Sequence, residues 1–164
     1  MSERLLLNFA YGSNMAPARL LARLPAAEYR GVVTLEGYRL TFNMLAHDGS
    51  TKCDIEKAHG ERVYGVIYAL TNAEKQQLDA IEGERYDCVE VTVTCQAAQT
   101  FTAFAYIANT HDANVLPYDW YLQHVVKGAE QAQLPTDYIA RIKATSVQPD
   151  SDRLRAAREY AVHR

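Results

Sequence analysis

The chain has 164 residues, of which 48% are hydrophobic, so it has the length of one ordinary domain and enough apolar side chains to form a core. Its 17 lysines and arginines against 20 aspartates and glutamates give a net charge of −3, and no stretch gathers basic residues among aromatic ones. We therefore expect a single domain over residues 1–164 and no nucleic-acid partner.

The sequence has no feature that favours export, a membrane or a metal site. Leu5, Leu6 and Leu7 are too short a run to span a bilayer and lead into a turn. The three cysteines have no close pair, which is typical of reduced thiols, and no two of the five histidines have helical spacing. We expect a cytoplasmic protein without membrane contact and without a bound metal. The oligomeric state is left open.

The first informative motif lies where a strand is expected to turn into a helix. Residues 5–10 have the apolar content of a buried strand, and residues 16–24 have leucines at helical spacing. Between them stands Tyr11-Gly12-Ser13-Asn14, in which the glycine allows a sharp bend and Ser13 or Asn14 can cap the helix. Such a bend can bind an anion, although on spacing alone a plain turn and helix cap is the better interpretation.

The middle of the chain predicts a β-meander followed by a short helix. Residues 29–70 alternate β-rich runs, at 32–35, 38–43, near Cys53 and at 63–70, with turn signals at residues 48–50 and at Gly60. Thr71 and Glu74 then form a capping box that opens a helix, and Gly83 is expected to stop it.

Glu82 falls in the last turn of this helix. There it meets the negative end of the helix dipole and other acidic residues, which should raise the pKa of its carboxyl. A carboxyl of this kind suits a general acid/base, although most glutamates at such positions are solvated surface residues.

The rest of the chain completes the expected fold. Residues 86–95 and 100–108 alternate apolar positions and should pair as a hairpin, and helical patterns follow at residues 118–131, 137–145 and 152–162. Five or more strands with one short helix among them, and helices at the end, predict an α+β fold with a strongly curved, barrel-like sheet. These patterns do not predict the order of the strands.

Two residues open the alternative of a hydrolase. Ser13 lacks the Gly-x-Ser-x-Gly elbow and has no evident histidine base. Cys53 stands beside Asp54, with His47 and His59 nearby in the sequence, but a lone cysteine is more often a small core residue.

Three motifs follow one another in a fixed order and spacing. They are Phe9-Ala10-Tyr11-Gly12-Ser13-Asn14-Met15, Val63-Tyr64-Gly65-Val66-Ile67-Tyr68 and Leu78-Asp79-Ala80-Ile81-Glu82-Gly83, and they are followed by Tyr121, Gly128-Ala129 and Leu134-Pro135. The ordered set resembles the γ-glutamylcyclotransferase family over nearly the whole chain. Any one of these motifs alone is a weak signal.

The resemblance implies a compact barrel-like fold and an enzyme that cleaves a γ-glutamyl amide by closing the glutamyl part into 5-oxoproline. It implies Glu82 as the catalytic acid/base, a backbone cradle of Gly12, Ser13 and Asn14 with Tyr11 beside it, and Tyr86 and Tyr121 in the pocket wall. The reaction takes a small-molecule substrate and needs no metal or organic cofactor. Asn14 favours the branch that acts on γ-glutamyl amino acids.

Two other functions stay open. One is a cyclotransferase that acts on a γ-glutamyl amine. The other is a non-catalytic binding or regulatory domain that recognises a γ-glutamyl or amino-acid-like metabolite.

Overall fold

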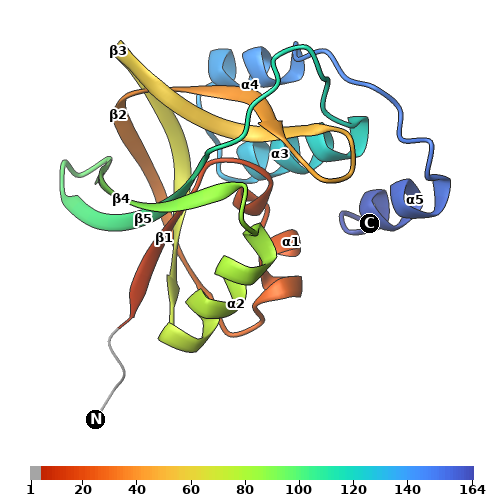
Figure 1. Ribbon diagram of the computed structural model, residues 1–164. Coiled ribbons are helices and arrows are strands. Elements are labelled where there is room, and N and C mark those ends of the chain that lie inside the picture. Colours follow the sequence, from red (N-terminus) through yellow and green to blue (C-terminus); the bar gives the residue numbers. More distant parts are fainter. Residues whose placement is uncertain (1–4) are drawn as a thin grey trace.

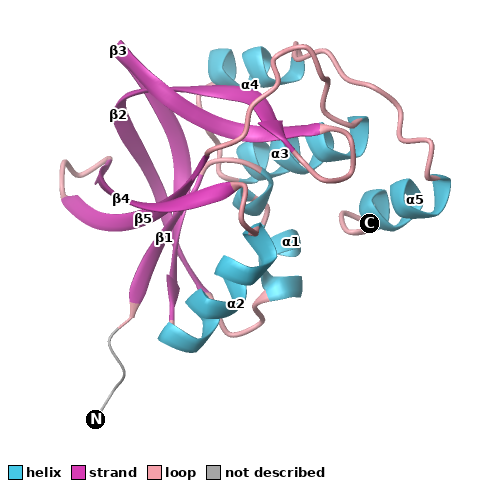
Figure 2. Cartoon of the chain, viewed as in Figure 1, coloured by secondary structure: helices cyan, strands magenta, loops and turns pink. Residues whose placement is uncertain are grey.

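The computed structural model describes residues 5–164, in which five strands close into a barrel and the helices gather on one side of the strands (Figures 1 and 2). In chain order the elements are β1 (Leu6–Ala10), the 3-10 helix η1 (Ser13–Met15), α1 (Pro17–Arg23), β2 (Glu28–Leu45), β3 (Thr51–Leu70), α2 (Asn72–Glu82), β4 (Tyr86–Cys95), β5 (Thr100–Ala108), α3 (Asp119–Gln131), α4 (Thr136–Lys143) and α5 (Arg153–Ala161). The predicted α+β class with a barrel-like sheet is confirmed.

The strand order around the barrel is β1-β3-β2-β4-β5, and β1 closes it against β5. All other neighbours are antiparallel, whereas β1 and β5 are parallel and meet at Asn8 and Phe104. The buried Asn8 amide donates a hydrogen bond to the Phe104 carbonyl at 3.4 Å. The Asn8 side chain, although it lies in an apolar strand, thus helps to join β1 to β5 where the barrel closes.

The segment before α2 differs from the prediction, because four expected short strands are two long ones. Residues 32–35 and 38–43 belong to β2, and Cys53 and residues 63–70 belong to β3. Gly37 (φ +82°) lies at a register shift of β2, and Gly60 (φ +79°) lies within β3. Glycine accepts this left-handed backbone, so a long strand can bend without ending. The barrel needs such bends to close.

The predicted helices and the hairpin of β4 and β5 are confirmed, and the last helix is a surface helix as expected. α5 lies at the edge of the molecule, farther from the strands than the other helices, and none of its residues is fully buried (Figure 1). Asp150 ties it to the core, because this carboxylate accepts hydrogen bonds from the buried Trp120 indole (2.9 Å) and from Arg155 (2.6 and 2.7 Å). Within residues 5–164, no helix is long and apolar enough to cross a bilayer.

Candidate active site

The Tyr11-Gly12-Ser13-Asn14 motif lies between β1 and α1, at the predicted strand-to-helix turn. The Met15 N–H donates to the Gly12 carbonyl at 3.1 Å, which closes η1. The expected cap is wrong, because Ala16 is the N-cap of α1 and no side chain caps this helix. The side chains of Ser13 and Asn14 are engaged elsewhere, and each reaches a different group of charged residues.

Three glycines, one from the first motif, one from the second and one from α3, allow close packing around this turn. A Cβ at Gly12 would lie 2.9 Å from the Cβ of Cys53, and one at Gly65 would lie 2.6 Å from the Phe9 ring. A Cβ at Gly128 would lie 2.6 Å from the backbone that joins η1 to α1. These separations are shorter than van der Waals contact, so any larger residue would displace the turn.

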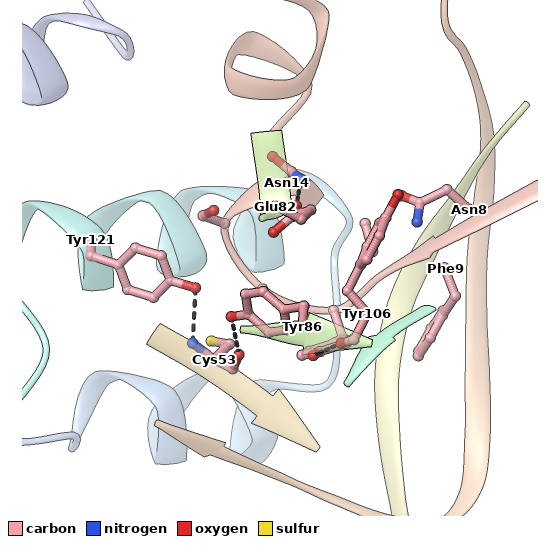
Figure 3. Close-up of a pocket in the computed structure, with 12 residues that line it drawn as sticks. Asn8, Phe9, Asn14, Cys53, Glu82, Tyr86, Tyr106 and Tyr121 are labelled. Carbon is pink, nitrogen blue, oxygen red and sulfur yellow. Dashed lines mark hydrogen bonds between the residues drawn. The ribbon is translucent and has the colours of Figure 1, made fainter. Parts of the chain in front are cut away.

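All seven residues expected at the site line one pocket, which Figure 3 shows. They are Tyr11, Gly12, Ser13, Asn14, Glu82, Tyr86 and Tyr121. Sequence reasoning did not assign the five further lining residues to it: Asn8, Phe9, Ala10, Cys53 and Tyr106. Asn8 could have been predicted as a site residue, because it is the one polar residue in an apolar strand. Tyr106 could not, because its position next to the pocket depends on how the barrel closes.

Glu82 is the last residue of α2, whose predicted capping box is confirmed. The Thr71 hydroxyl accepts from the Glu74 N–H at 3.2 Å, and the Glu74 carboxylate accepts from the Thr71 N–H at 2.9 Å. Gly83, with φ +81°, ends the helix. The Asn14 amide then donates to Glu82 Oε1 at 3.0 Å, which joins the third motif to the first (Figure 3).

Burial raises the pKa of the Glu82 carboxyl, while Arg23, Lys52, Arg19 and the Asn14 hydrogen bond act in the opposite direction. The direction agrees with the expectation, but the cause is different, because burial and not acidic neighbours produces the shift. Asp79, the other acidic residue of this motif, accepts a hydrogen bond from the Tyr106 hydroxyl at 2.6 Å and from Lys75 at 3.0 Å.

Three buried or half-buried tyrosines form the pocket wall. The Tyr11 hydroxyl donates to the Tyr106 carbonyl, and the Tyr86 hydroxyl donates to the Cys53 carbonyl at 2.6 Å. The Tyr121 hydroxyl oxygen accepts from the Cys53 N–H at 2.9 Å (Figure 3). Burial raises the pKa of Tyr11, Tyr86 and Tyr121 well above that of a free phenol. The wall is therefore neutral, polar and held in place by backbone hydrogen bonds.

The structure places neither candidate nucleophile beside a base. The Ser13 hydroxyl accepts from Arg19 Nε at 3.1 Å, and an arginine cannot take up its proton. Burial raises the pKa of the Cys53 thiol to about 12, so the thiol stays protonated at neutral pH. The histidine that pairs with Asp54 is His111, at 2.7 Å, and not His47 or His59.

Ser13 also contacts an ionic cluster that we call the Arg19 cluster, formed by the buried residues Arg19 and His124 and the half-buried residues Glu159 and His163. Glu159 Oε2 accepts from Arg19 at 2.8 Å and lies 2.7 Å from His124 Nε2, and His124 Nδ1 lies 2.6 Å from His163 Nε2. The hydrogen bond to His124 and the charge of Arg19 lower the pKa of Glu159 to about 2, and burial lowers the pKa of His124. Among residues 5–164, no three His, Cys, Asp or Glu side chains are arranged to hold a metal ion.

Comparison with known proteins gives consistent matches. The model of the AIG2-like family matches residues 62–142. The γ-glutamylcyclotransferase of Homo sapiens is 28% identical over 152 residues, covering 87% of this chain and 79% of the human protein. The γ-glutamylcyclotransferase of Bos taurus is 29% identical over 154 residues, covering 88% and 79%.

Solved structures match over nearly the whole chain. A γ-glutamyl cyclotransferase superposes with a TM-score of 0.83 at 23% identity, covering 94% of this chain and 98% of that one. An uncharacterised protein from Homo sapiens superposes with a TM-score of 0.85 at 25% identity, covering 99% and 100%. The chain is therefore similar to γ-glutamylcyclotransferases over most of its length, has the fold of these proteins, and is an enzyme that resembles them.

Proposed function

We propose that the enzyme converts a γ-glutamyl amide into 5-oxoproline and a free amine, with Glu82 as the catalytic acid/base. The names of the related enzymes support this class of substrate. The observation that carries the proposal in this chain is the 3.0 Å hydrogen bond from Asn14 to Glu82, which holds a carboxyl of raised pKa against the first motif, inside the pocket.

The reaction needs one group that moves protons. In a γ-glutamyl amide the attacking α-amine and the γ-carbonyl belong to the same molecule, so they are already close together. The amine, with a reference pKa of about 8, is largely protonated at neutral pH. Glu82 removes one proton from this ammonium group, and the neutral nitrogen attacks the γ-carbonyl carbon. Glu82 delivers that proton to the leaving nitrogen as the bond from the carbon to this nitrogen breaks. The ring nitrogen then loses its second proton through Glu82 to the freed amine, which leaves as an ammonium ion. Such acid/base catalysis contributes ~10²–10⁴ in rate.

The environment of Glu82 suits this double role. A base works best when its pKa lies near the operating pH, and burial moves the pKa of Glu82 upward from the ordinary glutamate value. The nearby cations limit this rise. Glu82 can thus accept a proton from an amine and still exist in the ionised form that the first step requires.

The turn at Gly12, Ser13 and Asn14 is proposed to hold a negatively charged part of the substrate. The first N–H groups of a helix have no partner within it, and Ser13 and Asn14 of η1 line the pocket. They would bind either the developing oxyanion of the γ-carbonyl or the α-carboxylate of the glutamyl part. A donor aimed at an oxyanion contributes ~10²–10³ in rate. Tyr11, Tyr86 and Tyr121 are the proposed pocket wall for the same substrate.

The alternatives have less support. A serine or cysteine hydrolase needs an activated nucleophile, whereas Ser13 faces Arg19 and Cys53 has a raised pKa. A binding domain has no need of an ionisable group with a raised pKa in its pocket. The cytoplasmic location and the single domain over residues 1–164 stay predictions.

An isotope experiment tests the proposed reaction. The purified enzyme is incubated with γ-glutamyl-L-alanine in water enriched in ¹⁸O, and the products are identified by mass spectrometry. We expect 5-oxoproline and alanine in equal amounts, with no ¹⁸O in the 5-oxoproline, because no water enters an intramolecular cyclisation. A hydrolase would instead release glutamate that carries ¹⁸O, and a binding domain would leave the substrate intact. Either result would contradict the proposal.

A further inference from the structure

Two cations beside Glu82 have no carboxylate partner within the part of the chain that the structure describes. Arg23, at the end of α1, makes one long hydrogen bond, at 3.5 Å, to the Asn14 carbonyl oxygen. Lys52, near the start of β3, lies with Nζ 6.0 Å from the centre of the Tyr121 ring. Both side chains are half-buried, and burial lowers the pKa of both. Buried charges are normally paired, so two unpaired cations at one place indicate an anionic ligand.

The two carboxylates that attract Lys52 both have other roles. Lys52 is attracted by Asp48 and Glu82 and repelled by Arg19 and Arg23. Asp48 lies in the turn between β2 and β3, where its carboxylate accepts hydrogen bonds from the Ser50 N–H (3.1 Å) and hydroxyl (2.6 Å). Glu82 is the group that has to exchange protons with the substrate. Neither carboxylate is therefore a dedicated partner for Lys52.

The position of the two cations relative to the pocket indicates which part of the substrate they meet. The glutamyl part has to occupy the pocket, because its amine must reach Glu82. Arg23 contacts Asn14, and Lys52 lies against the Tyr121 ring, so each cation touches a residue that lines the pocket and does not line it itself. Both cations also act electrostatically on Glu82. The leaving amine must also reach Glu82, and it is bonded to whatever part of the substrate extends out of the cavity.

We propose that Lys52 and Arg23 form a subsite for the carboxylate of the leaving amino acid, and that this subsite is the physical basis of the preference for γ-glutamyl amino acids that the resemblance implies. This inference rests on the proposed function. In a γ-glutamyl amino acid, this carboxylate is one carbon away from the leaving nitrogen, so a cation close to Glu82 can reach it. Hydrogen bonds to a charged group contribute roughly 1.5–3 kcal/mol, which corresponds to about 10- to 100-fold in kcat/KM.

Lys52 is the better residue to change. Arg23 contacts Asn14, which holds Glu82, so its substitution would disturb the catalytic group as well. Lys52→Met keeps an unbranched apolar side chain against the Tyr121 ring and removes the charge. Lys57→Met is the matched control, because Lys57 is exposed and lies on the same strand.

The test compares γ-glutamyl-L-alanine with γ-glutamyl-ethylamine, which differs from it by the missing carboxylate. For each protein, kcat/KM is measured by 5-oxoproline formation, and the ratio of the two values is the readout. We expect Lys52→Met to lower the ratio at least about tenfold and Lys57→Met to leave it at the wild-type value. An equal loss on both substrates would mean that Lys52 binds the glutamyl part, and an unchanged ratio would mean that it binds neither. Both results overturn the proposal.

A second measurement needs no variant. The wild-type enzyme should process γ-glutamyl-L-alanine at least about tenfold better, in kcat/KM, than γ-glutamyl-L-alaninamide, whose leaving group has the same size but no charge. Equal values overturn the subsite even if Lys52→Met does not fold. Failure of the proposed function looks different, because the wild-type enzyme would then form no 5-oxoproline from any of the three substrates.

Discussion

Two groups of charged side chains meet at adjacent residues of the first motif, and they differ in how their charges are paired. In the Arg19 cluster, which Ser13 contacts, the guanidinium and the Glu159 carboxylate are 2.8 Å apart and His124 completes the contact. Beside Glu82, which Asn14 contacts, Arg23 and Lys52 have no ion pair with a described residue. The pKa of Glu159 is lowered to about 2, whereas the pKa of Glu82 is raised.

The difference separates a structural role from a chemical one. A carboxylate that is fully paired stays ionised over the whole physiological range and does not exchange protons, so it holds elements together. A carboxyl whose pKa is raised by burial, and which lies among cations without carboxylate partners, is suited to take up and release a proton and to meet a charged ligand. We therefore expect substitutions in the two groups to affect different measurements.

The largest expected effect is on turnover, from Glu82→Gln. Glutamine keeps an oxygen that can accept from Asn14 but cannot move protons, so kcat for 5-oxoproline formation should fall by ~10²–10⁴. Because the folded-state pKa of Glu82 is raised, ionising it lowers stability as the pH rises above the ordinary value of 4.5. At pH 7 the variant should thus have a Tm equal to or above that of the wild type.

The control for this variant is Glu84→Gln, which changes an exposed carboxylate two residues away. It should keep wild-type kcat and Tm. If Glu82→Gln kept wild-type turnover, Glu82 would not be the base.

The next effect is on stability, from Glu159→Gln. The buried Arg19 guanidinium loses its anion, so the free energy of unfolding at pH 7 should fall by roughly 3 kcal/mol, at the low end for a broken buried pair. The folded-state pKa of Glu159 is depressed to about 2, so its contribution is complete above the unfolded value of 4.5 and is lost as the pH falls toward 2. The difference between wild type and variant should shrink over this window.

Denaturant unfolding at pH 7 and at pH 3 measures this difference. Glu130→Gln is the matched control, because Glu130 forms an exposed ion pair with Lys143 at 3.7 Å and should lose at most about 1 kcal/mol. Losses of similar size in the two variants would show that the Arg19 cluster is no more important for stability than a surface ion pair.

The smallest effect is on the pH dependence of activity, from Lys52→Met. The positive charge of Lys52 favours the ionised form of Glu82 and lowers its pKa, so removing this charge should raise that pKa further. The acid limb of the kcat/KM profile, which reports ionisation in the free enzyme, should therefore move to higher pH. A limb that stays in place would mean that Lys52 does not act on Glu82. The same profile measured for Glu159→Gln should move less, because Glu159 is absent from the charges that act on Glu82.

Much of the local structure could be predicted from short stretches of sequence. The capping box of Thr71 and Glu74, the hairpin of β4 and β5 and the turn at Gly12 each depend on residues that are close in the chain. The turn that was expected at Gly60 is instead a bend within β3, since a glycine with positive φ serves a turn and a strand bulge equally. Only the neighbouring strand decides between the two.

The sequence by itself determined the fold class, most helices and the motifs that indicate the family, because periodicity, caps and turns act over a few residues. The tertiary structure alone decided that Cys53 and Tyr106 also line the pocket, which charges are paired and why the pKa of Glu82 is raised. Asn14 and Glu82 are 68 positions apart, and Arg19 and Glu159 are 140 apart. Burial and pairing at such separations depend on the order of strands in the closed barrel and on where α5 docks, and no local pattern encodes them.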